Sequence, residues 1–315
     1  MPRRLAVLMD PIQKLKIHKD TTFAMLLEAQ RRGHELHVLE QRDLGLRDGR
    51  AWLRTRKTRV KDDPAGWFEQ DTANLRDATE FDWILLRKDP PFDAEYLYDT
   101  QILERAEACG ASVVNRPAAL RDANEKLFTA LFPQCCPPTL VSRLPADLRA
   151  FIDEHGECVA KVLDSMGGTS IFRVAAGDPN LNVIFETVTG EGSRAALVQR
   201  YIPQISEGDK RILMIDGEPV PYALARIPQA GEFRGNLAKG GRGRGQPLSE
   251  RDRWICAQVG PELRRRGLLF VGLDVIGDYL TEVNVTSPTC VRELDAAFGL
   301  NIAGDLFDRL EALRP

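Results

Sequence analysis

The sequence predicts a mixed fold class, with α/β structure at the N-terminus and α+β structure over the rest of the chain. A strand, a helix and a second strand are expected between residues 5 and 39, which is how an α/β layer begins. Farther along, short apolar runs are joined by glycine turns, a pattern typical of antiparallel hairpins. A chain of 315 residues is too long for one small core, so two or three packed units are expected.

The composition is that of an ordinary globular protein, with 43% hydrophobic and 28% charged residues. A net charge of -3 argues against a nucleic-acid-binding surface spanning the molecule. No apolar run approaches the roughly 18 residues that a membrane span needs. The first apolar run, Leu5–Met9, is short and ended by Asp10, which favours a strand over a signal peptide. The six cysteines fit neither zinc spacing nor a disulfide framework, so a reducing cytoplasm is expected.

The first unit is expected to be a layer of strands and helices. Asp20 and Thr21 can cap a helix that Gly33 closes. The other expected elements are strands at residues 5–10, Leu36–Leu39, Trp83–Leu86 and Ser112–Asn115, an edge hairpin at residues 51–61 and a helix at Tyr96–Ala108. The pattern changes around Pro117–Leu120, where we place a domain boundary.

The second half of the chain is expected to be richer in hairpins. Its expected elements are a helix holding Asn124–Phe128 and ended by Pro133, a helix at Leu144–His155, strands at Cys158–Leu163, Ile171–Val174 and Leu197–Ile202, a hairpin that begins at Asp209 and turns at Asp216-Gly217, a helix at Ser249–Arg266 and a closing helix from about Asn301.

The stretch Phe270–Pro288 is the most informative part of the chain. It contains two apolar runs joined by Gly277-Asp278, a dipeptide suited to a tight turn. Glu282 and Asn284 are two residues apart and share one face of a strand, and in a hairpin Asp274 would lie across from them. Such oxygen ligands suit Mg²⁺. The alternative is a surface hairpin with ordinary polar residues.

Two lysines and a glycine turn suggest contacts with phosphate. Lys161 lies in the middle of an apolar strand, where an ammonium needs an anion or a carboxylate partner. Lys126 is a less specific signal, because exposed helix lysines are common. The turn at Asp164–Ser170 can lay backbone N–H groups over a phosphate. It is not a P-loop, and a plain structural hairpin is the alternative.

Two further segments each have a functional and a plain interpretation. The end of the strand Leu197–Ile202 could offer backbone groups to an adenine edge, although most strand ends bind nothing. Residues 227–245 hold six glycines among nineteen residues. The segment has four basic side chains, Arg234, Lys239, Arg242 and Arg244, and one acidic side chain, Glu232. The segment is either a mobile lid that closes on phosphates or a solvated basic loop.

The order of these features resembles that of the ATP-grasp ligases, and the whole chain resembles the prokaryotic glutathione synthetase family. The stretches that carry the resemblance are Met9–Ile12, Phe23–Gly33, Arg87–Asp93, Asn124–Phe128, Ile227–Gln229, Arg234–Ala238 and Glu282–Cys290. Several of them lie outside any nucleotide site. One departure is Ser165, which stands where the family usually has a glycine, so the shape of that turn is expected to differ.

The resemblance implies a Rossmann-like pre-ATP-grasp domain at residues 1–122 and a two-lobed ATP-grasp domain, with its small lobe at 123–202 and its large lobe at 203–315. The large lobe would carry the lid at 227–245. The implied activity is the joining of γ-glutamylcysteine to glycine, with ATP and Mg²⁺, or Mn²⁺, through an acylphosphate. A cytoplasmic homotetramer without nucleic-acid or membrane partners is also implied.

The resemblance also implies roles for individual residues. The implied nucleotide-binding residues are Lys126, Lys161, Gly167, Gly168, Gln199, Arg200, Tyr201, Ile202, Asp209 and Arg211. The implied metal ligands are Asp274, Glu282 and Asn284. The implied catalytic residues are Arg211, Arg234 and Arg242, and the implied substrate-binding residues are Arg226, Asn284 and Ser287.

Two other functions compete with this one. The chain could be an ATP-grasp ligase with another acid and amine, for example one that adds glutamate or D-alanine. It could also be a regulatory nucleotide-binding module without turnover. The presence of both lysines and all three implied metal ligands argues against such a module, which has no need of the full set.

Overall fold

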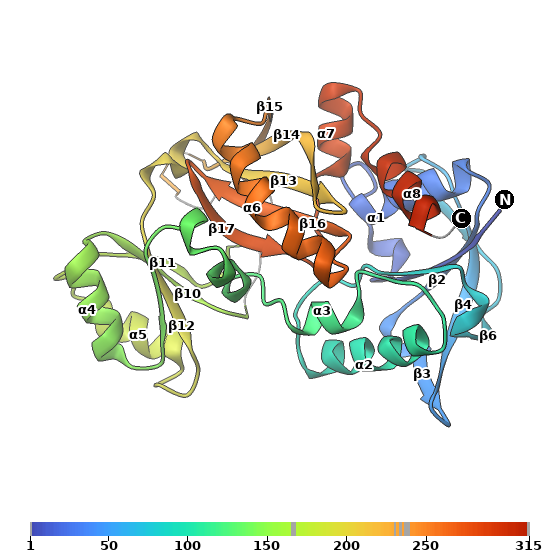
Figure 1. Cartoon of the computed structure of the whole chain (residues 1–315), viewed down its shortest axis with the longest axis horizontal. Coiled ribbons are helices and arrows are strands. Elements are labelled where there is room, and N and C mark those ends of the chain that lie inside the picture. Colours follow the sequence, from blue (N-terminus) through green and yellow to red (C-terminus); the bar gives the residue numbers. More distant parts are fainter. Residues whose placement is uncertain (1, 165–167, 230, 233–234, 236–239, 314–315) are drawn as a thin grey trace.

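The computed structural model describes residues 2–164, 168–229, 231–232, 235 and 240–313. The described elements are arranged around three β-sheets. In Figure 1 the first sheet lies at one end of the molecule and the second at the other end, with the third between them. Among the described helices, none is both long enough and apolar enough to span a membrane.

The first sheet has eight strands in the order β3-β4-β2-β1-β7-β8, with β5 and β6 also paired to β4. The strands are β1 (Arg4–Leu8), β2 (Glu35–Leu39), β3 (Leu44–Arg47), β4 (Arg50–Val60), β5 (Phe68–Gln70), β6 (Asn74–Asp77), β7 (Trp83–Leu86) and β8 (Val113–Val114). β1 is parallel to β2 and β7, and β7 is parallel to β8. Its helices are α1 (Thr21–Arg31), α2 (Ala94–Ala108) and α3 (Pro117–Arg121). The α/β layer expected from the sequence is confirmed.

The predicted edge hairpin at residues 51–61 is wrong. This stretch is the single strand β4, which pairs with β2 on one side and lies inside the sheet. The hairpin turn comes earlier, at Asp48 and Gly49, where both residues have positive φ angles of 51° and 77°. Asp and Gly tolerate the left-handed conformation that such a turn requires.

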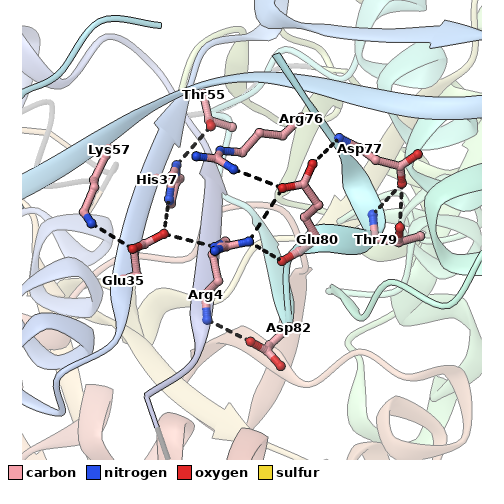
Figure 2. Close-up of polar contacts among 10 residues, drawn as sticks. All are labelled: Arg4, Glu35, His37, Thr55, Lys57, Arg76, Asp77, Thr79, Glu80 and Asp82. Atoms are coloured by element: carbon pink, nitrogen blue, oxygen red, sulfur yellow. Dashed lines mark hydrogen bonds and ion pairs between the residues drawn. The ribbon is translucent and has the colours of Figure 1, made fainter. Parts of the chain in front are cut away.

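A polar network joins the strands β1, β2 and β4 of the first sheet (Figure 2). The carboxylate of Glu35 accepts hydrogen bonds from Arg4 at 3.0 Å and Lys57 at 2.8 Å, and lies 2.9 Å from the Nε2 atom of His37. Hydrogen bonds from Lys57, His37 and Arg4 lower the pKa of Glu35 to about 2. These contacts link β1, β2 and β4, and none of the four residues lines the cavity described below.

The second sheet is antiparallel, with the order β11-β10-β12-β9. Its strands are β9 (Thr139–Ser142), β10 (Cys158–Val162), β11 (Ile171–Val174) and β12 (Ala196–Arg200). Leu148 and Ile152 of α4 (Pro145–His155) and Phe185 of α5 (Leu181–Thr189) share one apolar core with these strands. The sequence predicted α4 but not α5. Before this sheet, Asn124–Lys126 precede the 3-10 helix Leu127–Leu131, where the sequence had suggested one longer helix.

The third sheet is also antiparallel, with the order β15-β14-β13-β16-β17. Its strands are β13 (Asp209–Ile215), β14 (Glu218–Ile227), β15 (Arg242–Pro247), β16 (Phe270–Ile276) and β17 (Tyr279–Asn284). The helix α6 (Glu250–Arg266) lies between β15 and β16, and α7 (Val291–Phe298) and α8 (Ile302–Leu313) follow β17. The helix expected at Ser249–Arg266 is present, and Ser249 caps it by accepting a hydrogen bond from the Asp252 N–H. The sequence did not predict α7.

The glycine-rich segment 227–245 is shorter as a connection than the sequence suggested. Arg242 and Arg244 belong to β15 and pair with Ile227 and Ala225 of β14. The remaining connection includes residues 230, 233–234 and 236–239, which lie outside the described residues. The lid therefore remains a prediction from the sequence.

Candidate active site

One cavity of about 300 Å³ lies where the three sheets meet. Asp89 reaches it from the segment after β7, and Gln199 reaches it from β12 in the second sheet. The third sheet contributes Asp209 and Arg211 from β13 and Asp274 from β16. Residues that are far apart in the sequence thus converge on one space lined by charged and apolar side chains.

Most of the residues predicted from the sequence line this cavity. They are Lys126, Lys161, Gly168, Gln199, Arg200, Tyr201, Ile202, Asp209, Arg211, Arg226, Asp274, Glu282, Asn284 and Ser287. Arg242 does not line it, since its side chain is exposed on β15. Gly167 and Arg234 lie outside the described residues.

The C-terminal hairpin places the predicted metal ligands on one side of the cavity. β16 and β17 are antiparallel, and Asp274 lies directly opposite Glu282. Asn284 follows two residues later and lies opposite Gly272, as the sequence spacing predicted. A β-bulge between Asp274 and Val275 changes the register on the side of the turn.

Two arginines hold the buried carboxylate of Asp274. The Nε and Nη2 atoms of Arg211 lie 2.5 and 3.1 Å from its two oxygens, and Nη2 of Arg226 lies 2.8 Å from Oδ2. Burial alone would raise the pKa of Asp274, but Arg211 and Arg226 hold it well below its ordinary value. Asp274 is therefore a carboxylate at neutral pH.

Lys126 connects a second pair of carboxylates. Its ammonium pairs with Glu125 and lies 3.7 Å from Oε1 of Glu282. Burial and the charge of Glu282 raise the pKa of Glu125 to about 7, against the opposing charge of Lys126. The backbone of Glu125 also accepts a hydrogen bond from the Val283 N–H at 2.8 Å, which fixes this segment beside β17. Glu125 was not predicted as a site residue, because a glutamate beside a lysine is typical of a solvated surface.

Lys161 is a buried cation without a carboxylate partner among the described residues. Its Nζ atom lies 3.5 Å from Oε1 of Gln199, which is a weak contact. Burial lowers the pKa of Lys161, although Glu282 opposes this effect. A buried ammonium with so little compensation is expected to face an anionic ligand.

Asp209 offers an unused acceptor in the cavity. Its Oδ2 atom pairs with Arg226, whereas Oδ1 is buried and has no hydrogen-bond partner among the described residues. Burial raises the pKa of Asp209 to about 6, with Arg226 opposing the shift. A ligand hydroxyl would satisfy this oxygen.

Five aliphatic side chains form an apolar wall of the same cavity. They are Val159, Ile171, Ile202, Ile205 and Ile276. Aliphatic side chains in a cavity with a few polar groups suit the faces of a flat base. Apart from Ile202, these residues were not predicted from the sequence, because an isolated isoleucine or valine looks the same in sequence whether it lines a core or a site.

The donor set on the hairpin fits Mg²⁺. Asp274 and Glu282 supply carboxylates, and the Nδ2 atom of Asn284 donates to Gly272 O at 3.3 Å, which leaves its Oδ1 atom for a ligand. Mg²⁺ prefers such oxygen ligands and keeps waters or phosphate oxygens in its remaining positions. The described residues hold no cluster of three or more His, Cys, Asp or Glu side chains suited to a metal, and the predicted set has two carboxylates and one amide.

Comparisons with known proteins agree with this geometry. The profile of the prokaryotic glutathione synthetase N-terminal domain matches residues 4–121, and that of its ATP-grasp domain matches residues 125–299. The chain belongs to the prokaryotic glutathione synthetase family. The expected fold class is also confirmed, because an N-terminal domain precedes an ATP-grasp domain.

Curated relatives match the chain over nearly its full length. The glutathione synthetase of Xanthomonas campestris pv. campestris is 64% identical over 308 residues, covering 98% of each chain. That of Pseudomonas aeruginosa is 59% identical over 312 residues, covering 99% of this chain and 98% of the relative. Membership of this family makes the chain an ATP-dependent ligase.

Solved structures show the same fold at low identity. D-cycloserine synthetase DcsG superposes with a TM-score of 0.66 at 16% identity, covering 97% of this chain and 99% of that one. The ATP-grasp ligase PsnB, complexed with a minimal precursor, Mg and ADP, gives a TM-score of 0.61 at 17% identity, with 98% and 97% coverage. The likeness to these structures concerns the fold alone.

Proposed function

We propose that the cavity binds ATP with a divalent metal and that the enzyme joins γ-glutamylcysteine to glycine, giving glutathione, ADP and phosphate. The observation that carries the proposal is the position of Asp274, Glu282 and Asn284, which face the same cavity as Lys126 and Lys161. A metal site beside two buried ammonium groups is what a polyphosphate requires, because both neutralise its charge.

The cavity offers a separate surface to each part of the nucleotide. The apolar wall suits the adenine, and the free Oδ1 atom of Asp209 suits a ribose hydroxyl. Lys126, Lys161 and the backbone near Gly168 suit the phosphates. The backbone N–H groups of Arg200 and Tyr201 already bond to Pro138 O and Glu157 O at 3.0 and 2.9 Å, so these two groups are not free for the adenine edge.

The reaction needs two steps, because a carboxylate is a poor electrophile. In the first step, an oxygen of the dipeptide's cysteine carboxylate attacks the γ-phosphorus of ATP, and the bond from that phosphorus to the bridging oxygen of ADP breaks. In the second step, the amine of glycine attacks the acylphosphate carbon, phosphate leaves with the electron pair, and the nitrogen loses a proton. Neither step requires a nucleophile from the protein.

The side chains of the site act by position and charge. Lys126 and Lys161 offset the negative charge that spreads over the transferring phosphoryl group. Arg211 keeps Asp274 charged and fixed in place. A bound Mg²⁺, or Mn²⁺ in its place, would polarise the phosphate oxygens and hold them in line.

The dipeptide is proposed to lie near Ser287, whose hydroxyl donates to Asp89 at the edge of the cavity. Arg226 is committed to Asp209 and Asp274 through two ion pairs. We therefore propose that Arg226 supports the substrate site by holding these carboxylates. The catalytic roles of Arg234 and Arg242 remain predictions from the family resemblance.

Coupled ADP release, with γ-glutamylcysteine, glycine and ATP omitted in turn, tests the function. Full release only with all three, together with glutathione detected by mass spectrometry, is the expected result. Parallel reactions replace γ-glutamylcysteine with another γ-glutamyl acid, or glycine with glutamate or D-alanine. Faster turnover with a replacement than with the proposed pair would reassign the enzyme to another acid–amine ligation.

Three further properties are proposed on the same family basis. The domain limits at residues 122 and 202 are supported by the separate second and third sheets, which begin at Thr139 and Asp209. All six cysteines are free thiols, which suits a cytoplasmic enzyme. A homotetramer is proposed, and light scattering coupled to gel filtration would test it.

A further inference from the structure

The side-chain amide of Asn115 forms a buried clip between the first sheet and the C-terminal hairpin. Its Nδ2 atom donates to Phe270 O at 2.8 Å and to Val285 O at 2.7 Å. Its Oδ1 atom accepts from the Phe270 N–H at 2.9 Å. Asn115 follows β8 directly and is 5% exposed, so these three hydrogen bonds are shielded from water.

The clip joins the two open ends of the hairpin, opposite its Gly277-Asp278 turn. Phe270 is the first residue of β16, and Val285 follows the last residue of β17, the proposed metal ligand Asn284. Asn115 itself does not line the cavity. Its three hydrogen bonds go to the backbone at the open end of both strands and not to the side chains of the proposed metal ligands.

The register of the metal face depends on this open end. Between the turn and the bulge, Val275 pairs with Leu280, whereas beyond the bulge Asp274 pairs with Glu282 and Gly272 with Asn284. Because the bulge interrupts the ladder, the tight turn alone does not fix which residues oppose each other at the metal face. Two side-chain bonds within the hairpin, from Thr281 to Asp274 O and from Asn284 to Gly272 O, support this pairing, and a contact at the open end would hold it further.

The segment after β17 has further contacts with the first domain. Arg87 donates to Pro288 O at 3.0 Å, and the Val291 N–H donates to Thr21 at 3.3 Å. Among these contacts, only the Asn115 amide bonds both strands of the hairpin. Loss of its donors would leave two buried carbonyl groups unsatisfied at the two strand ends.

We propose that Asn115 is a positioning residue that fixes the register of β16 and β17 and thereby the relative placement of Asp274, Glu282 and Asn284. This inference rests on the proposed metal site. If Asn115 fixes the register, disrupting the clip reduces the increase in nucleotide affinity that a bound metal causes. If Asn115 only stabilises the fold, disrupting it lowers the melting temperature and leaves that coupling intact.

The test is Asn115→Asp, which keeps the shape but replaces the donor by a carboxylate facing two carbonyl groups. Calorimetric titration of ADP with and without Mg²⁺ gives the factor by which the metal tightens ADP binding. We expect this factor to fall by about fivefold or more, while metal-free ADP affinity changes by less than about twofold. Because the readout is equilibrium binding, it does not depend on turnover.

Two control variants separate register from general stability. Gln30→Glu makes the same acid-for-amide exchange in a clip elsewhere, where the Gln30 amide bonds Val60 N and O at 2.8 and 2.7 Å. Leu36→Ala removes a buried side chain of β2, a strand that does not pair with β16 or β17. In both variants Mg²⁺ is expected to tighten ADP binding by the same factor (the metal factor) as in the unchanged enzyme. This should hold even where the melting temperature falls as far as in Asn115→Asp.

An unchanged metal factor in Asn115→Asp, or an equal loss in Leu36→Ala at the same melting temperature, would overturn the proposal. Should Asn115→Asp fail to fold, Asn115→Thr keeps one hydroxyl donor and faces the same criterion. The unchanged enzyme distinguishes the two levels of inference. If Mg²⁺ does not tighten ADP binding to the unchanged enzyme, the proposed metal site is wrong. If Mg²⁺ tightens ADP binding equally in the unchanged enzyme and in Asn115→Asp, only the role of Asn115 is rejected.

Discussion

Arg211 and Asp274 lie directly opposite each other on adjacent strands β13 and β16 and are joined by two hydrogen bonds of 2.5 and 3.1 Å. Arg226 approaches the same carboxylate from β14. The proposed metal ligand is thus also the centre of a buried charge cluster. Changes at Asp274 and at Glu282, which sits across the hairpin, are therefore expected to have different consequences for stability.

Asp274→Asn is expected to abolish activity and to destabilise the fold. The substitution removes the charge that compensates two buried guanidinium groups, and breaking a buried pair in this way costs about 3–5 kcal/mol. Urea unfolding should show a loss of that order in the free energy of unfolding. Unaltered stability would mean that Asp209 alone suffices to compensate Arg211 and Arg226.

Glu282→Gln is expected to remove most activity and to leave the fold intact. Glu282 is partly exposed, and its ion-pair contact with Lys126 is long at 3.7 Å, so the neutral amide is tolerated. The lost charge weakens Mg²⁺ binding at nearly constant shape. ADP release across a range of Mg²⁺ concentrations, with thermal melting alongside, measures both effects. Near-normal turnover at ordinary Mg²⁺ would remove Glu282 from the ligand set.

Lys161→Met is expected to raise the apparent KM for ATP by about ten- to a hundredfold and to lower turnover. A charged hydrogen bond to phosphate contributes about 1.5–3 kcal/mol, and 1.4 kcal/mol corresponds to a factor of ten. Methionine retains the apolar stem, and Lys161 has no ion pair to lose among the described residues, so stability should hold or increase. A collapse of stability with unchanged nucleotide affinity would make Lys161 a structural residue.

Asp209→Asn is expected to remove part of the pH dependence of stability. The pKa of Asp209 is about 6 in the folded chain, against an ordinary 3.8, first because the group is buried. Between pH 3.8 and about 6 the folded chain therefore keeps a proton that the unfolded chain has released. The free energy of unfolding that this proton contributes is lost as pH rises through about 6.

From about pH 7.5 to about pH 5 the unchanged enzyme should gain about 1 kcal/mol from this group, and the variant should lack that gain. Urea unfolding of both proteins at the two pH values measures the difference. Glu125, whose pKa is also raised, changes both proteins alike and cancels in the comparison. Identical pH dependence of the two proteins would place the Asp209 titration outside this range.

Several parts of the site could be predicted because their signals are local. The Glu282/Asn284 spacing and the Gly277-Asp278 turn specify a two-sided hairpin whatever surrounds it. Lys161 stood out because a lysine in an apolar strand is costly without a counter-charge. The capping residue Asp20 likewise marked the start of α1.

Other parts were missed because nothing local distinguishes them. The helices α5 and α7 are each shorter than ten residues, and their sequences were not recognised as helical. The turn at Asp48 and Gly49 was overlooked, so the strand β4 was taken for a hairpin.

By itself, the sequence determined the fold class, the order of the main elements, the family and the residues that converge on the cavity, since periodicity, turn chemistry and motif order are properties of neighbouring residues. Only the tertiary structure decided how those residues share their charges. Arg226 binds both Asp209 and Asp274, and Asn115 reaches Phe270 across 155 positions of sequence. The Arg226 pairs join neighbouring strands of one sheet, whereas the Asn115 contact joins two sheets. Both arise only in the folded chain, because burial leaves each polar group to pair with a partner that folding brings within hydrogen-bonding distance.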